Sequence, residues 1–390
     1  MNPAPKPDQS VPTPSRGGSS KDSVALAPEA PSTWVLISNK PGDDNQSILL
    51  AEALGRPFAV KKMVFGREPR LPLLDNVFGP SLSALDQEQS DPLEPPWPDL
   101  AITAGRRQEA VMRWIKRRSG GRTRLVQFNR PKALADFDLV VVPPQLLVPP
   151  RPNVYTMRLP LHRADDESGL EQAGKDWAPV LGDRPRPWLM AMVGGPAWPF
   201  IVDAEVAAHL MAELQAYADS LGGSLFVTTS PRTPPEAIAA LRAATRPQDY
   251  LYVWSPDPSA NPFKGLLQLC DEFVVTCDSV SMPTQVVRLQ KPLAIYRLPE
   301  RWALRKKSKT FFREIMHRNQ GGILGGLVSS SASWIGIGYT RDFMAFHDGL
   351  VAEGSASYFG EAIRPPKAPP PDDLAEVVSR VRAILDRPDT

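Results

Sequence analysis

The sequence lacks the features that mark several large classes of protein. It contains only two cysteines, Cys270 and Cys277, among 390 residues, too few for a disulfide framework or a Cys-rich zinc site. We expect both to be small buried side chains in a reducing compartment. No apolar run approaches the ~20 residues that a membrane-spanning helix needs, and the first residues lack the charged and apolar regions of a signal peptide. These absences predict a cytoplasmic protein.

The chain also lacks a large excess of positive or negative charge, and it lacks the common catalytic signatures. The 45 basic and 43 acidic side chains leave a formal net charge of +2, which argues against wholesale nucleic-acid binding. The chain has no His-Glu-x-x-His, Gly-x-Ser-x-Gly or Gly-x-x-x-x-Gly-Lys-Ser/Thr motif. Metallohydrolases, serine hydrolases and P-loop NTPases are therefore disfavoured.

The sequence does contain a regular alternation of short apolar runs and helix-like segments, which is typical of parallel βαβ units. Residues 1–32 are rich in Pro and Ser and predict a disordered leader. We expect Rossmann-like domains at 33–165 and 187–320, followed by an extension at 321–390 whose helix, 372–386, packs back on a domain. The predicted fold class is α/β, with two tandem doubly wound domains facing a cleft.

The individual elements follow from the apolar runs and their spacing. Strands are expected at 34–38, 58–64, 99–103, 124–128, 138–142, 188–193, 225–229, 251–254, 273–276 and 292–296. Helices are expected at 46–54, 108–118 and 204–220, and near 235–245 and 262–269. The polar, Gly- and Asp-containing stretch 164–186 is predicted to be a linker.

The stretch Phe273–Tyr296, FVVTCDSVSMPTQVVRLQKPLAIY, is the strongest indication of a site. An apolar strand leads into a hydroxyl-rich turn, a helix-sized segment and a second apolar strand. Asp278, Ser279 and Ser281 fall at the turn, where they can cap the next helix and offer hydroxyls beside its unpaired N–H groups. The helix dipole favours an anion there, so a nucleotide diphosphate is a natural ligand. The alternative is that the serines only cap the helix.

Several turn sequences, taken together in their order, carry a resemblance to a known family. They are GDDNQ at Gly42–Gln46, PDLAITAGRR at Pro98–Arg107, FDLVVVPPQ at Phe137–Gln145, TTSPRTP at Thr228–Pro234 and NPFKGLLQLCDEFVVTCDSVSM at Asn261–Met282. Through these motifs the chain resembles the mitochondrial-fission (elongated-mitochondria) family, and the resemblance covers most of the stretch 34–302. The resemblance implies an architecture similar to the GT-B glycosyltransferases, with a nucleotide-sugar bound by the second domain.

The sequence departs from the family pattern at two places in the predicted donor site. Gln285 stands where the family usually has a Glu, which in GT-B enzymes typically holds the donor ribose. Gln285 can still hydrogen-bond a ribose, but a carboxylate accepting two hydroxyl protons would bind it more strongly. The family's TSRRTP also appears as TSPRTP, with Pro231 in place of one Arg. Donor affinity is expected to be weakened or altered.

The second domain carries the predicted donor-binding residues. Gly194 and Gly195 end a strand, where absent side chains would let the backbone approach a ligand. Arg232 lies in a Pro-bounded loop, where its guanidinium could pair with a diphosphate and stabilise the leaving group. A plain tight turn and a solvated surface Arg are the alternatives. The full predicted set is Gly194, Gly195, Thr229, Arg232, Asn261, Asp278, Ser279, Ser281, Met282 and Gln285.

The first domain is expected to face the acceptor. Asp43 is the candidate general base, which would take a proton from an acceptor hydroxyl, although acidic residues at a helix start are often only dipole partners. His162, near the domain junction, is the second candidate base. The remaining acceptor-side residues are Asn45, expected to cap the helix, Gln46 in its first turn, and Arg106 and Arg107 directly after a strand.

Basic residues concentrate at Arg106–Arg124 and Arg301–Arg318, with aromatic and aliphatic residues interleaved. Either run could rest on an anionic membrane surface. The alternative is an ordinary solvated helix face whose apolar stripe lies in the core.

Together these patterns predict a glycosyltransferase-like protein that moves a sugar from a nucleotide-sugar to a hydroxyl acceptor, lipid-linked or in the cell envelope. No metal or other cofactor is expected, and the location is cytoplasmic, with peripheral binding to the inner face of the membrane. The alternative is a non-catalytic scaffold that binds a membrane or protein partner. A nucleotide-sugar epimerase with bound NAD is set aside, because Ser38–Asp44 has only one Gly where that cofactor needs a Gly-x-Gly-x-x-Gly turn.

Overall fold

The computed structural model describes residues 32–38, 41–66, 80–129, 131, 133–146, 148, 150–161, 169–257, 261–301 and 342–387, without the side chains of residues 41–43. The predicted leader up to residue 31, the candidate base His162 and most of the basic run Arg301–Arg318 lie outside the described residues.

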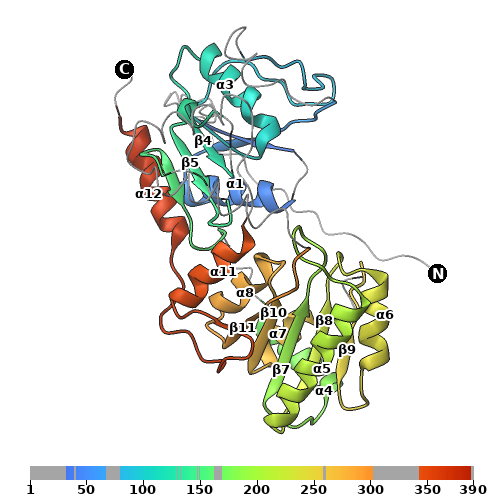
Figure 1. The fold of residues 1–390 in the computed structure, drawn as a ribbon. Helices are drawn as coiled ribbons and strands as arrows, with labels where there is room; N and C mark the ends of the chain where they lie inside the picture. The colour runs from blue at the N-terminus through green and yellow to red at the C-terminus, as the bar shows by residue number, and fades with distance from the viewer. Residues whose placement is uncertain are drawn as a thin grey trace, which may run out of the picture. The chain divides into compact units, whose positions relative to one another are not determined.

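The N-terminal half of the described chain forms one parallel sheet (Figure 1). Its strands are β1 (Thr33–Ile37), β2 (Phe58–Lys62), β3 (Leu100–Ala104), β4 (Arg124–Phe128), β5 (Leu139–Val142) and β6 (Val154–Thr156). They are ordered β2-β1-β3-β4-β5-β6. The connecting helices are α1 (Pro41–Leu54), η1 (Arg106–Gln108), α3 (Glu109–Arg118) and η2 (Leu134–Asp136).

The C-terminal half forms a second parallel sheet. Its strands are β7 (Trp188–Val193), β8 (Ser224–Thr229), β9 (Tyr250–Tyr252), β10 (Glu272–Thr276), β11 (Leu293–Tyr296) and β12 (Ser357–Tyr358). They are ordered β12-β11-β10-β7-β8-β9. The helices are α4 (Leu170–Leu181), α5 (Ala204–Ser220), α6 (Pro235–Ala244), α7 (Phe263–Leu269), α8 (Ser281–Arg288) and α11 (Phe343–Ala352).

Burial on both faces explains why the strands read as continuous apolar runs. Every residue of β3, β7 and β8 is buried, as expected for parallel strands covered by helices on both sides. Each sheet builds its own apolar core, with one cluster around the C-terminal sheet and two around the N-terminal sheet. The predicted fold class, two tandem parallel α/β domains, is confirmed.

Each sheet has one place where the direction of strand addition reverses. In the C-terminal sheet it lies between β7 and β10, and in the N-terminal sheet between β1 and β3. In open parallel sheets the loops at the carboxyl ends of such strands diverge and leave room for a ligand. These two edges are therefore the first places to look for a site.

Several features differ from the sequence prediction. The predicted linker 164–186 contains α4, which packs so closely on α7 that a Cβ added at Gly174 would lie 2.8 Å from Gln268 Cγ. Helix α1 begins at Pro41 rather than Gln46, as proline favours the first helical position. The short strands β6 and β12 and the helix α11 were not predicted.

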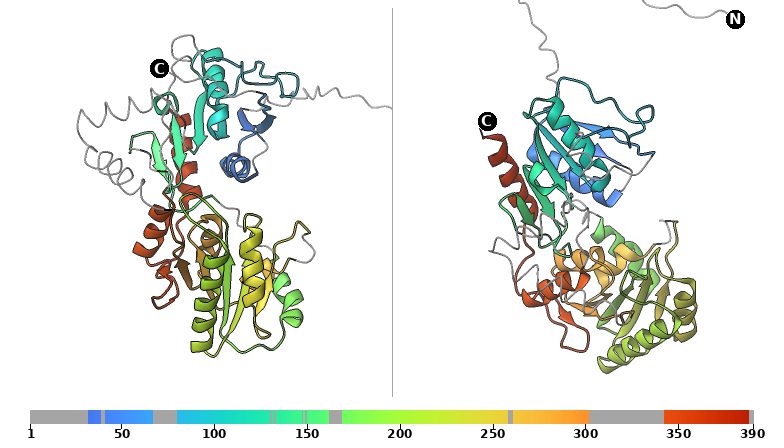
Figure 2. Two further views of the ribbon diagram at one scale, coloured as in Figure 1. Left: turned by 45° about the vertical axis from the view of Figure 1, so that its right-hand side comes forward. Right: turned by 45° about the horizontal axis from the view of Figure 1, so that its top comes forward.

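The last helix, α12 (Asp373–Leu385), contacts α1, β4 and β5 of the N-terminal sheet. Figures 1 and 2 show it running alongside that sheet. Val377, Val381 and Ile384 are at most 5% exposed and join the apolar core on that side. Among the helices of the described chain, none is long and apolar enough to cross a membrane.

Candidate functional site

The strand ends at the reversal point of the C-terminal sheet place several predicted residues together. Gly194 follows β7 and Cys277 follows β10, its neighbour in the sheet. Ser230 follows β8 on the other side of β7. The loops after these three strands meet around one carboxylate, that of Asp278.

Asp278 is the centre of a buried hydrogen-bond network. Its Oδ2 accepts from Gly195 N and from Arg232 Nη2, both at 2.9 Å. Its Oδ1 accepts from Thr276 Oγ1 at 2.6 Å. The Asp278 side chain is 0% exposed. Burial raises its pKa above that of an exposed aspartate, while the hydrogen bonds from Thr276 and Gly195 and the charge of Arg232 offset part of the rise.

The two glycines are needed because protein atoms occupy the space beside them. A Cβ at Gly194 would lie 2.0 Å from Asp278 Oδ2, and a Cβ at Gly195 would lie 2.0 Å from the carbonyl oxygen of Arg232. Both distances are far below van der Waals contact. The sequence interpretation assigned this close approach to a ligand, whereas in the structure the neighbouring loops make it.

The loop that carries Arg232 is held by two hydroxyl side chains that sequence reasoning missed. Thr233 Oγ1 donates to Gly194 O at 2.6 Å and accepts from Ser230 N at 2.9 Å. Ser230 Oγ accepts from Arg232 N at 3.2 Å. The backbone of Arg232 is therefore fixed, while its side chain remains 47% exposed. The TSPRTP motif contained this signal, since hydroxyl residues spaced by three commonly brace a turn.

The start of α8 separates the roles of the two serines. Ser279 Oγ accepts from Met282 N at 3.3 Å, and the residue is 4% exposed. Ser279 thus accepts a hydrogen bond from the first turn of the helix, whereas Ser281, the first residue of α8, is exposed. One turn later Gln285 is half-buried. Met282 packs against the apolar core of the C-terminal sheet.

The two remaining predicted donor residues make local hydrogen bonds. Thr229 Oγ1 accepts from Trp254 N at 2.9 Å and so connects the ends of β8 and β9. Asn261 Oδ1 accepts from Phe263 N at 3.0 Å and supports the start of α7. Both side chains shape the loops at this edge of the sheet.

The predicted acceptor side lies at the corresponding edge of the N-terminal sheet. Asp43 falls in the first turn of α1, and its side chain is outside the described residues. The neighbouring Asp44 is 6% exposed and accepts from Ser38 N at 3.1 Å. Asn45 lies inside α1 and is exposed, so its prediction as a helix cap is wrong. Gln46, in the same helix, is half-buried.

Arg106 and Arg107 are exposed in η1, directly after β3. Further along the same basic run the apolar residues point inward. Met112 and Ile115 are 0% exposed, and the Trp114 ring packs edge-on against Trp97 with centroids 5.8 Å apart. In this run the apolar stripe belongs to the core.

His347 is a further residue at the site that the sequence did not indicate. It lies on α11, is 0% exposed, and places Nε2 2.9 Å from Cys277 O, one residue before Asp278. Burial lowers the pKa of His347 to about 4. The ring is therefore neutral at pH 7, and because a carbonyl only accepts, Nε2 carries the hydrogen. Any residue can supply a backbone carbonyl, so no sequence spacing marks this contact.

Both cysteines are buried, as predicted. Burial raises the pKa of each thiol to about 12, which keeps both in the protonated, unreactive form. Across the described residues, no group of three or more His, Cys, Asp or Glu side chains is placed to hold a metal ion.

Comparison with known proteins connects the chain to one family. The family model described as Mitochondrial fission ELM1 matches residues 41–324. The mitochondrial fission protein ELM1 of Arabidopsis thaliana is 25% identical over 312 residues, which cover 74% of this chain and 64% of the relative. An uncharacterised protein of Rickettsia prowazekii (strain Madrid E) is 21% identical over 318 residues, 73% of this chain and 88% of the relative.

Among solved structures, MurG of Acinetobacter baumannii is 12% identical, with a TM-score of 0.43 over 90% of this chain and 100% of that one. The family match extends from α1 through β11 and includes the Asp278 network. The chain belongs to the mitochondrial fission ELM1 family.

Proposed function

We propose that the carboxyl edge of the C-terminal sheet binds the diphosphate of a nucleotide-sugar, and that the protein transfers the sugar to a hydroxyl acceptor. The proposal rests on how the Arg232 side chain is held and how much of it is exposed. Its backbone is fixed by Ser230 and its Nη2 by Asp278, yet about half of its side chain faces solvent. A guanidinium held in place but not covered is preorganised for an anion.

The helix α8 supplies a second source of positive potential at the same place. Its first residue, Ser281, is three positions after Asp278, and the backbone N–H groups of a first helical turn favour an anion. Asp278 connects the two parts, since it pairs with Arg232 and immediately precedes the α8 turn. A diphosphate bound between Arg232 and Ser281 would meet donors from both.

The proposed reaction is a direct displacement at the anomeric carbon. The bond from that carbon to the diphosphate oxygen breaks, the acceptor oxygen forms the new bond, and the acceptor proton passes to a base. Arg232 and the α8 N-terminus stabilise the negative charge that develops on the nucleoside diphosphate, so the proposed transfer needs no metal. Asp43 remains the proposed base and His162 the second candidate.

The acceptor is proposed to bind at the corresponding edge of the N-terminal sheet. The exposed Arg106 and Arg107 would favour an acceptor that carries phosphate or lies near an anionic membrane. A lipid-linked hydroxyl compound has this chemistry. The proposed location is therefore cytoplasmic, with peripheral membrane binding.

A thermal-shift titration with nucleoside diphosphates and nucleotide-sugars tests the donor site. A ligand at about 100 times its Kd stabilises the folded state by about 2.7 kcal/mol, which a melting curve resolves. We expect a shift for the wild type that Arg232→Gln and Ser281→Ala reduce. Arg242→Gln, which removes an exposed arginine from the last turn of α6, is the matched control and should leave the ligand-dependent shift unchanged. Equal shifts in Arg232→Gln and the wild type would remove Arg232 from the site.

A non-catalytic scaffold is the second candidate, and two features favour it. Asp278 and the Arg232 carbonyl already fill the space beside Gly194 and Gly195, and Gln285 stands where a ribose-binding carboxylate would be expected. Such a protein would bind a membrane or a protein partner. It would show no shift with any nucleotide at millimolar concentration, whereas a transferase must bind its donor.

A further inference from the structure

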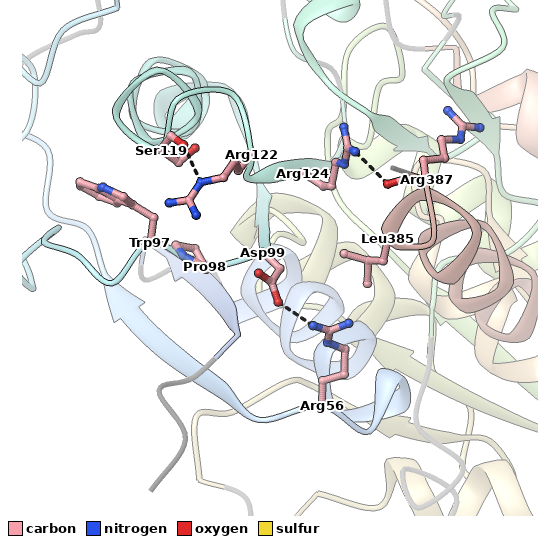
Figure 3. Close-up of a pocket in the computed structure, with 9 residues that line it drawn as sticks. All are labelled: Arg56, Trp97, Pro98, Asp99, Ser119, Arg122, Arg124, Leu385 and Arg387. Atoms are coloured by element: carbon pink, nitrogen blue, oxygen red, sulfur yellow. Dashed lines mark hydrogen bonds and ion pairs between the residues drawn. The ribbon is translucent and has the colours of Figure 1, made fainter. Parts of the chain in front are cut away.

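A cavity of about 360 Å³ lies at the opposite, amino-terminal edge of the N-terminal sheet (Figure 3). Its walls come from the residues before β2, β3 and β4 and from the carboxyl ends of α3 and α12. The lining residues are Arg56, Trp97, Pro98, Asp99, Ser119, Arg122, Arg124, Leu385 and Arg387. The proposed transfer chemistry uses none of them.

The lining is strongly basic. Four arginines and one aspartate leave an excess of three positive charges in the lining. Arg56 pairs with Asp99 at 2.8 Å, and their side chains are 36% and 63% exposed, respectively. Figure 3 shows the guanidinium groups of Arg56 and Arg122 on either side of Asp99, with Trp97 next to Arg122. Of the four arginines, Arg56 pairs with Asp99 and Arg124 Nη1 lies 3.9 Å from Asp138 Oδ1, whereas Arg122 and Arg387 have no carboxylate partner among the described residues.

Two of the arginines are held in place by backbone carbonyls. Arg122 Nε donates to Ser119 O at 3.1 Å. Arg124 Nη2 donates to Arg387 O at 3.2 Å, and the Arg124 side chain is only 15% exposed. The guanidinium groups are therefore positioned in advance, which lowers the entropy that a ligand would have to overcome.

Helix capping is the simpler explanation for basic residues at this edge. The helices run opposite to the strands, so α3 and α12 end here, and their last carbonyls attract cations. Capping accounts for Arg122 Nε but leaves its Nη1 and Nη2 without a hydrogen bond among the described residues. The guanidinium of Arg387 likewise has no hydrogen-bond partner within the described chain. These donors remain available to an external acceptor.

We propose that this arginine pocket binds a phosphate-bearing ligand, a phosphomonoester or diphosphate group. A planar guanidinium matches the oxygen spacing of phosphate and can donate two parallel hydrogen bonds to it. Arg122 and Arg387 supply the donors that the fold does not use, and Trp97 and Leu385 provide an apolar wall for the rest of the ligand. A volume of about 360 Å³ lies within the range of small-molecule sites.

The test is a titration of the full chain with pyrophosphate, followed by Tm and by calorimetry. Arg232→Gln is the background for all variants, because pyrophosphate could also occupy the proposed donor site. In this background we expect a saturable shift that Arg122→Gln and Arg387→Gln weaken about tenfold in Kd. Arg117→Gln is the matched control: it removes an exposed arginine from the last turn of α3, outside the pocket, and should leave Kd unchanged.

Three outcomes would overturn the proposal. The first is an equal shift with sodium chloride at the same ionic strength, which would show general charge screening. The second is an unchanged pyrophosphate Kd in Arg122→Gln and Arg387→Gln. The third is the absence of any pyrophosphate binding in the Arg232→Gln background, which would leave the donor site as the place where pyrophosphate binds.

Vesicles distinguish a free ligand from a lipid headgroup. Phosphatidylcholine vesicles containing phosphatidic acid present a phosphomonoester on a surface, and sedimentation measures binding. Binding that pyrophosphate competes away and Arg387→Gln weakens would support the pocket with a headgroup as its ligand. Pyrophosphate binding without vesicle binding would support it with a soluble phosphate compound.

Discussion

The two C-terminal helices are each fixed by one buried polar side chain, but on different sheets. In α11, His347 is 0% exposed and bonds Cys277 O at the end of β10. In α12, Asp373 is 1% exposed and accepts from Tyr155 OH at 2.6 Å, from Leu159 N at 3.0 Å and from Arg158 N at 3.2 Å, beside β6. The end of the chain therefore attaches one helix to each domain.

The difference between the two attachments is chemical. His347 makes one hydrogen bond as a neutral ring, and its Nδ1 has no partner among the described residues. Asp373 satisfies two backbone N–H groups and a phenol at once. Removing the acid leaves several donors unsatisfied, whereas the imidazole is vulnerable mainly to protonation. One attachment should respond to mutation and the other to pH.

The largest effect is expected from Asp373→Ala. The change leaves the N–H groups of Arg158 and Leu159 and the hydroxyl of Tyr155 without their acceptor. We expect a loss of about 3 kcal/mol in the free energy of unfolding, since each buried unsatisfied donor costs roughly 1–3 kcal/mol. Urea denaturation followed by circular dichroism measures it. A loss below 1 kcal/mol would show that water replaces the carboxylate.

The next effect is a pH dependence carried by His347. Its pKa in the folded state is lowered to about 4 from 6.5. When the pKa of a histidine is lower in the folded state than in the unfolded state, the unfolded chain takes up the proton first as the pH falls. The contribution of that histidine to stability is therefore complete above pH 6.5 and is lost as the pH falls toward 4. Between pH 7.5 and 4.5 this loss amounts to about 2.5 kcal/mol.

His347→Gln isolates that contribution. Glutamine keeps a donor for Cys277 O but does not titrate. The difference in unfolding free energy between wild type and variant should shrink as the pH falls from 6.5 toward 4. The contributions of the other titrating groups cancel in this difference, because both proteins contain them. A constant difference across this range would mean that His347 is accessible to protons in the folded state.

The sequence predicted the sheets well because a strand buried on both faces leaves a local signature. β7 and β8 are continuous apolar runs for this reason. α4 left a weaker signature, since few of its residues are buried and Pro179 lies inside it. Its buried face is completed by Gly174, whose contact with Gln268 on α7 depends on the tertiary fold.

The sequence selected the residues around Asp278 as a candidate site but did not predict how they are connected. Asp278, Arg232 and the two glycines were all selected from turn chemistry. Their hydrogen bonds join positions up to 83 residues apart, such as Gly195 and Asp278, and depend on the pairing of β10 with β7. Sequence spacing alone cannot give that register. For the same reason the sequence predicted a diphosphate as the partner of Arg232 and did not indicate its ion pair with the buried Asp278.

The smallest predicted effect concerns the caps of the two helices and sharpens their comparison. Asp342 accepts from Met344 N at 3.1 Å at the start of α11, and Asp372 accepts from Ala375 N at 3.0 Å at the start of α12. The two caps have the same chemistry, so Asp342→Ala and Asp372→Ala should each cost about 1 kcal/mol in urea denaturation. If the two cap variants lose the same stability while Asp373→Ala and His347→Gln have unequal effects, the difference between the helices lies in their buried side chains. A much larger cost for one cap would instead show that its helix is attached mainly through its first turn.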